Sequence, residues 1–131
     1  MLKIDTGFKP VKATPDAVYA FLADMNNLQK LMPEQVINWK SDTDSCTYTI
    51  KGMADIGMII TDREPVSLVK MASHGKVPFQ FTLNIAIRPA GDGSEANLVF
   101  EGEINAFMKM MVEKPLTNFF NMLADGLSKQ F

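Results

Sequence analysis

The side chains able to do chemistry are few and stand far apart in the sequence. His74 is the only histidine, in the turn SHGKVP, and Cys46 is the only cysteine. A general base needs a positioned partner and an enclosed substrate, whereas a polar side chain beside Gly75 is expected in an exposed turn. Nothing near Cys46 in sequence would lower the pKa of its thiol, so we expect an inert buried thiol rather than a nucleophile.

The charged residues show no catalytic or metal-binding pattern. Glu101 and Glu103 alternate outward on a predicted strand, which is the wrong side for acid–base work. Residues 62–64, with the sequence DRE, could guard a cavity mouth, but a solvated strand end is the simpler interpretation. One histidine cannot build a histidine-rich metal site, and the carboxylates lack ligand spacing. We therefore predict no catalytic residue, no metal and no cofactor.

Tyr48 is the polar side chain with the clearest potential role. It lies on the same predicted strand face as Cys46 and Ile50. A phenol in an apolar pocket can orient a ligand through one hydrogen bond. The ordinary alternative is a core tyrosine whose hydroxyl reaches backbone or water. Both interpretations stay open at this point.

The segment AFMKMMVEKPLTNFFNML, residues 106–123, concentrates methionine and phenylalanine near the end of the chain. Methionine fills core gaps as readily as it lines binding surfaces. A helix here would place one broad apolar face on Met108, Met111, Val112, Phe119, Leu123 and Leu127. Met110 falls outside that face and is expected at a rim or toward a partner. Pro115 inside a helix costs ~3 kcal/mol, so we expect a kink or break near Lys114.

The elements that would position these side chains follow from hydrophobic periodicity. Residues 2–8 alternate as a strand, which Pro10 should confine to a sheet edge. The sequence ATPDAVYAFLADM predicts a helix with Thr14 as N-cap and Pro15 at its first position. A second short helix is predicted over residues 26–31. Six strands follow, at residues 36–40, 46–51, 55–62, 66–73, 79–88 and 95–104.

The predicted strands are joined by short segments rich in turn residues, which connect antiparallel neighbours. In FQFTLNIAIR, residues 79–88, alternate positions are apolar, so one sheet face is packed and the other is wet. In strand 66–73 the inward face is undecided. The two options are Ser67, Val69 and Met71, or Val66, Leu68 and Ala72.

The stretch VKATPDAVYAFLADMNNLQKLMP resembles the opening of START-like proteins, the SRPBCC or polyketide cyclase/dehydrase-like superfamily. The matching positions are Val18, Tyr19, Phe21, Leu22 and Asp24. The resemblance implies an α+β helix-grip fold: a curved antiparallel sheet of about seven strands around a long C-terminal helix, with two short helices after the first strand and a cavity between sheet and helix. Members of this superfamily use the cavity for lipids, sterols or polyketides; a minority are enzymes, and others bind proteins or act as co-chaperones.

Composition narrows the classes of function. The chain of 131 residues has a net charge of -2, with 47% hydrophobic and 21% charged residues. No basic stripe is available for nucleic acid, and no apolar run reaches the roughly 18–20 residues that span a bilayer. The N-terminus does not match a signal peptide. We expect one domain over residues 1–131, a cytoplasmic location and a monomer or weak homodimer.

These patterns predict a protein that binds a small hydrophobic or amphipathic molecule, in a space that the sheet and the last helix do not completely fill. The predicted lining is Tyr48, Ile56, Met58, Phe79, Phe81, Leu83, Leu98, Phe100, Met108, Met111, Phe119 and Leu123. The first alternative is an enzyme of the polyketide cyclase/dehydrase or hydrolase type acting on an apolar substrate. The second is a protein-interaction module without a ligand.

Overall fold

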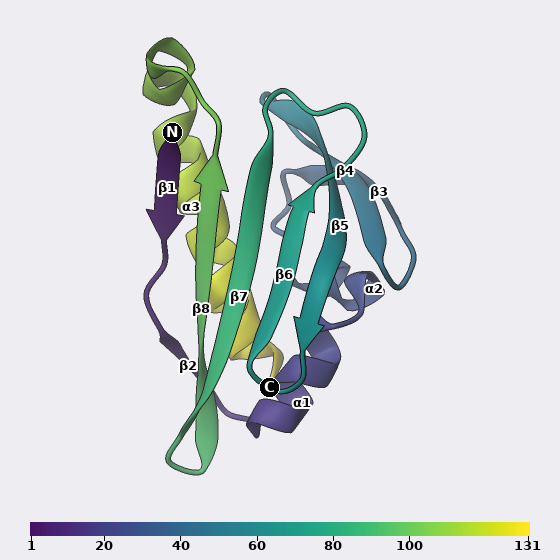
Figure 1. Cartoon of the computed structure of the whole chain (residues 1–131), viewed down its shortest axis with the longest axis vertical. Coiled ribbons are helices and arrows are strands. Elements are labelled where there is room, and N and C mark those ends of the chain that lie inside the picture. The colour runs from purple at the N-terminus through teal and green to yellow at the C-terminus, as the bar shows by residue number, and fades with distance from the viewer.

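Two layers make up the computed structural model, which describes residues 1–131: an antiparallel sheet and the long helix α3 (Ala106–Gln130) (Figure 1). The strand order is β1-β8-β7-β6-β5-β4-β3, and β2 also pairs with β8. The structure therefore has the α+β, helix-grip arrangement that the family resemblance implied. Short helices follow the first two strands and lie at the end of the sheet near the C-terminus (Figure 1).

The predicted first strand is two strands in the structure. β1 (Leu2–Asp5) and β2 (Lys9–Val11) both pair with β8, and Gly7, with φ of 74°, interrupts them. Glycine adopts this left-handed conformation at low cost, so the chain can step between the two pairings. Pro10 lies on this outer edge, as expected for a residue without a backbone donor.

The predicted helix start is confirmed. α1 (Pro15–Leu22) has Thr14 as N-cap, and the Thr14 hydroxyl accepts a hydrogen bond from the Ala17 backbone N–H at 3.3 Å. The second short helix divides into α2 (Met25–Leu28) and the 3₁₀ turn η1 (Gln29–Leu31). Asp24 caps α2 by accepting from the Asn26 N–H at 2.9 Å.

The remaining strands form successive antiparallel hairpins. They are β3 (Val36–Ser41), β4 (Ser45–Ile50), β5 (Ala54–Glu64), β6 (Leu68–Ser73), β7 (Phe81–Ala90) and β8 (Gly93–Gly102). The structure places Val69 and Met71 in the core, which decides the open question about β6. β7 begins two residues later than predicted, so Phe79 lies in the preceding loop although its side chain is buried.

α3 continues through Pro115, so of the expected kink or break near Lys114 the structure excludes the break. Pro115 removes the donor that would bond to the carbonyl of Met111. Both residues lie on the exposed side of the helix, where water can bind that carbonyl. The missing bond therefore costs less than it would in the core.

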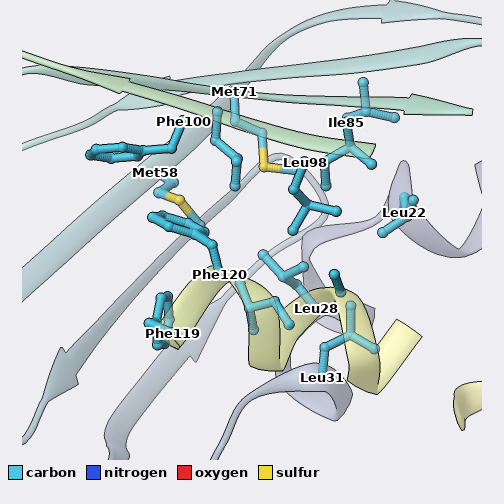
Figure 2. Packing of buried hydrophobic residues seen from close by; sticks show 14 of the residues in the cluster. Leu22, Leu28, Leu31, Met58, Met71, Ile85, Leu98, Phe100, Phe119 and Phe120 are labelled. Atoms are coloured by element: carbon cyan, nitrogen blue, oxygen red, sulfur yellow. The ribbon is translucent and has the colours of Figure 1, made fainter. Parts of the chain in front are cut away.

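The core lies between the sheet and the second half of α3. Phe120 points from the helix toward Phe100 and Met58 on the sheet, and the Phe119 ring lies beside it (Figure 2). Rings of Phe100 and Phe120 stack with centroids 4.8 Å apart. Such aromatic pairs add to the free energy gained by burying their apolar area.

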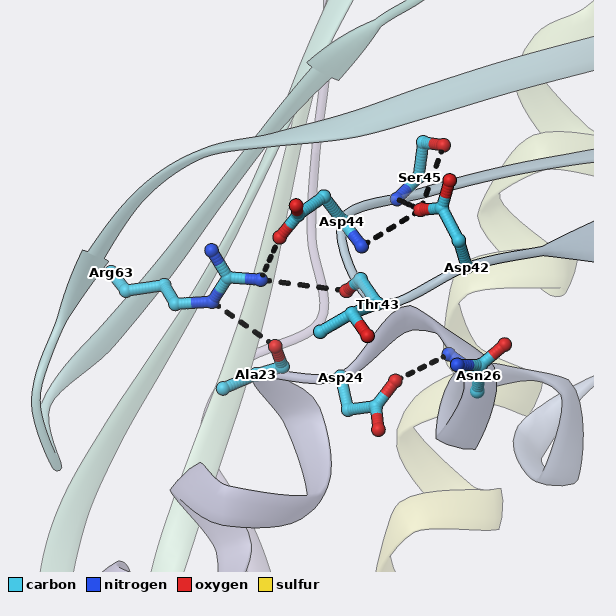
Figure 3. A network of polar contacts seen from close by, with 8 residues as sticks. All are labelled: Ala23, Asp24, Asn26, Asp42, Thr43, Asp44, Ser45 and Arg63. Carbon is cyan, nitrogen blue, oxygen red and sulfur yellow. Dashed lines mark hydrogen bonds and ion pairs between the residues drawn. The ribbon is translucent and has the colours of Figure 1, made fainter.

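Arg63 closes the end of the sheet near α1. Its guanidinium donates to the carbonyl of Ala23 at 3.1 Å and to the carboxylate of Asp44 at 2.7 Å (Figure 3). One side chain thus joins β5 to the end of α1 and to the β3–β4 turn. The charged segment 62–64 is therefore not a simple solvated strand end, because Arg63 has a structural role.

Candidate ligand site between the sheet and α3

A small, partly open void lies between the sheet and the first buried turn of α3. Its volume is about 10 Å³. Ten side chains line it, and none is charged: Tyr48, Ile50, Ile56, Met58, Phe79, Phe81, Phe100, Leu116, Phe119 and Phe120. They come from β4, β5, β7, β8, the loop before β7 and α3. The sheet curvature and the helix together place these distant segments around one point.

The void is too small for an organic ligand in this conformation. About 10 Å³ is close to the lower limit for one water molecule, whereas small-molecule pockets measure roughly 300–1,000 Å³. Aromatic rings fill the expected space: Phe79 and Phe100 lie edge to face at 6.3 Å, and Phe119 and Phe120 at 5.3 Å. The expectation of an open cavity is wrong for this conformation, because side chains pack across the gap.

Most of the predicted lining residues are buried, but they do not all reach the void. Seven of the twelve line it: Tyr48, Ile56, Met58, Phe79, Phe81, Phe100 and Phe119. Leu83, Leu98 and Leu123 are buried elsewhere in the core, and Met108 is half-buried against it. The residues that form the packed core and the residues that line the void are therefore overlapping but different sets.

The prediction that Met111 lies on the buried face of α3 is wrong. Its side chain is 63% exposed. The buried Leu116 lies five positions further along the chain, which corresponds to about 140° around the helix. The face that packs on the sheet is centred on Leu116, Phe120 and Leu123, so Met111 points away from the core. Met110, predicted to fall outside the apolar face, is 86% exposed.

Three lining residues were absent from the predicted set: Ile50, Leu116 and Phe120. The alternation of β4 had already placed Ile50 on the inner face with Tyr48. Leu116 and Phe120 are four residues apart, and Phe119 is three residues from Leu116, which is the spacing of one helix face. Centring the apolar face on these residues would have recovered both and excluded Met111.

Tyr48 supplies the only hydroxyl in the void lining. Its side chain is 3% exposed, and its ring stacks with Trp39 at 5.3 Å and with Phe119 at 6.3 Å. The hydroxyl donates only to the thioether sulfur of Met58, at 3.9 Å. Burial, followed by the nearby Cys46, raises the pKa of Tyr48 well above its ordinary value. The phenol is therefore neutral. Its hydroxyl forms no hydrogen bond with a backbone group or with an oxygen of another side chain.

The other candidate groups lie outside the void. Burial raises the pKa of the Cys46 thiol to about 12, which agrees with the predicted inert thiol. His74 is exposed, as predicted, and borders a polar hollow of about 490 Å³ on the outer sheet face with Lys40, Asp55 and Lys76. Nowhere do three His, Cys, Asp or Glu side chains gather closely enough to hold a metal ion.

Residues 106–115 form the turns of α3 that precede its first buried residue, Leu116, and the start of the helix extends beyond the end of β8 (Figure 1). We call this segment the projecting turns. It exposes three large apolar side chains: Phe107 at 73%, Met110 at 86% and Met111 at 63%. The void lies just below, at the level of Leu116 and Phe119. None of the helices is both long and apolar enough to cross a membrane.

The fold recurs in solved structures of low sequence identity. A START superfamily protein from Mycobacterium smegmatis has a TM-score of 0.76 at 11% identity, covering 98% of this chain and 95% of that chain. A protein from Thermus thermophilus has a TM-score of 0.76 at 15% identity, with 98% and 95% coverage. The Aha1 dimer from Colwellia psychrerythraea has a TM-score of 0.63 at 18% identity, with 98% and 97% coverage.

These structural similarities establish the fold. No curated protein matches the sequence. A family model described as polyketide cyclase / dehydrase and lipid transport matches residues 6–130, from the β1–β2 connection to the last turn of α3. Because that match spans nearly the whole chain, the protein belongs to the polyketide cyclase/dehydrase and lipid transport family.

Proposed function

We propose that the protein binds a small apolar or amphipathic molecule between the sheet and α3, and that the site opens to admit it. The observation that carries the proposal is the void beside Phe119 and Phe120, lined only by apolar groups and one hydroxyl. Membership of a family that includes lipid transport supports the same class of ligand. Apolar surface leaving water would supply about 25 cal/mol per Å².

Opening requires side chains or the helix to move, because the void holds about 10 Å³. Met58 can change rotamer readily, since its side chain is unbranched. The projecting turns of α3 have few core contacts, with Met108 and Val112 only half-buried. Moving this segment would expose Leu116 and Phe119 and enlarge the void without separating the sheet strands.

Enzymatic activity on an apolar substrate has less support. General acid–base catalysis uses titratable groups positioned at the reacting atoms. The void lining contains one titratable side chain, Tyr48, and burial disfavours its ionised form. The charged groups near His74 lie on the outer face of the sheet instead.

Native mass spectrometry and titration with a fluorescent apolar probe test the binding proposal. The expected result is saturable uptake by the wild-type protein. Phe120→Ala should enlarge the void and strengthen uptake of a small probe, because residual cavities between apolar side chains accept apolar molecules. Phe107→Ala is the matched control, since Phe107 is exposed on the same helix. Absence of saturable uptake in all three proteins would reject the proposal.

Self-association is a second candidate, favoured by the exposed Phe107, Met110 and Met111. Their spacing places them on one outward face of the projecting turns, and such a patch can pair with the same patch on a second copy. The Aha1 protein with this fold forms a dimer. Sedimentation of wild-type protein and of Met110→Lys would separate the candidates: association lost with probe uptake unchanged indicates two independent properties.

A further inference from the structure

The Tyr48 hydroxyl lacks a satisfactory hydrogen-bond partner although it is buried. Its single contact is Met58 Sδ at 3.9 Å, and a thioether sulfur is a weak acceptor. Buried hydroxyl groups are normally bonded to oxygen or nitrogen, because water is lost on burial. A hydroxyl left with so weak a partner raises the free energy of the empty protein. Each such group in a native structure therefore calls for a physical explanation.

Water does not provide that explanation. The void beside Tyr48 has about 10 Å³, which is close to the minimum for one water molecule. An ordered buried water makes two to four hydrogen bonds. Here the lining offers one hydroxyl and otherwise hydrocarbon groups and one thioether. A water in the void would therefore have too few partners to be held there.

The surrounding packing also holds the phenol in place. Trp39 and Phe119 both stack with the Tyr48 ring, with interplanar angles of 16° and 25°. The ring cannot easily turn its hydroxyl toward solvent through these neighbours. The donor is thus fixed in direction before any ligand arrives, which reduces the entropy lost on binding.

We propose that the Tyr48 hydroxyl is the polar anchor of the site and donates a hydrogen bond to an acceptor oxygen, such as a carbonyl, of a small neutral apolar ligand. This assignment rests on the proposed function. A ligand acceptor fits better than a ligand donor, because an unpaired buried donor is less well tolerated than an unpaired acceptor. The ligand oxygen would replace the weak contact to Met58.

The absence of charged side chains around the void also limits the class of ligand. No lysine, arginine or histidine lines the void. A carboxylate placed against Tyr48 would be buried without a counter-ion, which is strongly unfavourable. The phenol is protonated and able to donate at neutral pH, because its ordinary pKa is alkaline and burial raises it further. Neutral ketones, esters and similar carbonyl compounds are therefore preferred over free acids.

The test compares acetophenone with α-methylstyrene, which has nearly the same shape but a methylene group in place of the carbonyl oxygen. Dissociation constants are measured by calorimetry or NMR for wild type, Tyr48→Phe and Tyr19→Phe. Comparing the ratio of the two constants between proteins removes the difference in solubility. Tyr19 is the matched control, since it is the only other tyrosine and lies on α1 outside the void.

Tyr48→Phe should reduce acetophenone affinity about tenfold and leave α-methylstyrene affinity unchanged. Tyr19→Phe should change neither. The carbonyl stretch of bound acetophenone should lie at lower wavenumber in wild type than in Tyr48→Phe. Because the hydroxyl has no oxygen or nitrogen partner, Tyr48→Phe should fold with a thermal midpoint equal to or above that of wild type.

Each other outcome has a distinct meaning. If both probes bind with the same ratio in wild type and Tyr48→Phe, the anchor is rejected and the binding function stands. If neither compound binds wild type although the fluorescent apolar probe does, the anchor is rejected and the binding function stands; if the fluorescent probe is not taken up either, both fail. If benzoate binds more tightly than acetophenone, the assignment to neutral ligands is wrong.

Discussion

The two halves of α3 carry similar side chains in different surroundings. The projecting turns, residues 106–115, hold Phe107, Met110 and Met111 with their side chains in solvent. The packed half, residues 116–130, holds Phe119 and Leu123, each 2% exposed or less. One continuous helix thus extends from a solvated segment into the core. Residue type alone does not set the energetic role of a side chain, since the sheet covers only one half of the helix.

The functional meaning of the two halves differs as well. The packed half contributes Leu116, Phe119 and Phe120 to the void lining. The projecting turns contribute none of the ten lining residues, but they lie next to the void and have few core contacts. We infer that the packed half sets the ligand chemistry, whereas the projecting turns control access.

Phenylalanine on each half gives the largest expected contrast. Phe119→Ala should lower the free energy of unfolding by about 3–5 kcal/mol, because it removes a buried ring and leaves a cavity. Phe107→Ala should change it by less than about 0.5 kcal/mol, because that ring is already in water. Urea denaturation measures both, and Phe119→Leu serves if the alanine variant does not fold. Equal losses at the two positions would contradict the comparison.

Alkaline pH should destabilise the region packed around the void. The folded protein raises the pKa of Cys46 to about 12 and that of Tyr48 above its ordinary value. As the pH rises, each group therefore loses its proton at a lower pH in the unfolded chain than in the folded protein. Their contribution is present below the unfolded pKa values and is lost as the pH rises from about 9 upward, by up to about 1.4 kcal/mol per pH unit for each group.

Urea denaturation between pH 8 and pH 11 measures this loss. Cys46→Ala is the control, because it should remove the part of the decline that begins near pH 9 and leave the part due to Tyr48. A free energy of unfolding that stays constant over this range in wild type would argue against dry packing around these groups.

Pro115 marks the boundary between the two halves. Pro115→Ala should raise the free energy of unfolding by about 1–3 kcal/mol, because alanine restores a backbone donor inside the helix. Amide hydrogen exchange in residues 106–115 should become slower. If the projecting turns control access, uptake of an apolar probe should slow in the same variant. Faster exchange in this segment would show that the proline stabilises the helix rather than weakening it.

The smallest effect is expected at the most exposed methionine. Met110→Lys should change the free energy of unfolding by less than about 0.5 kcal/mol, because Met110 is 86% exposed. Met122→Lys, at a 44% exposed position on the packed half, should cost more than Met110→Lys. The thermal unfolding midpoints of the two variants measure the cost of the same Met-to-Lys substitution on each half of α3.

Sequence patterns were most successful where local chemistry decides the structure. The cap at Thr14, the start at Pro15, the edge position of Pro10 and the alternation along β7 all follow from side-chain and backbone properties within a few residues. One error could have been avoided from the helix pattern, because an apolar face centred on Leu116 and Phe120 excludes Met111. The other error concerns long-range packing: whether α3 continues through Pro115 depends on where the sheet ends, and no pattern within the helix contains that information.

The order of elements, the apolar face of the sheet and the buried position of Tyr48 were determined by the sequence, because periodicity and turn residues act over short distances. Only the tertiary structure decided how much space remains between sheet and helix, about 10 Å³. It also decided that the Tyr48 hydroxyl meets only the sulfur of Met58. Both depend on ring positions from strands and a helix far apart in the chain, and such positions follow from packing in three dimensions.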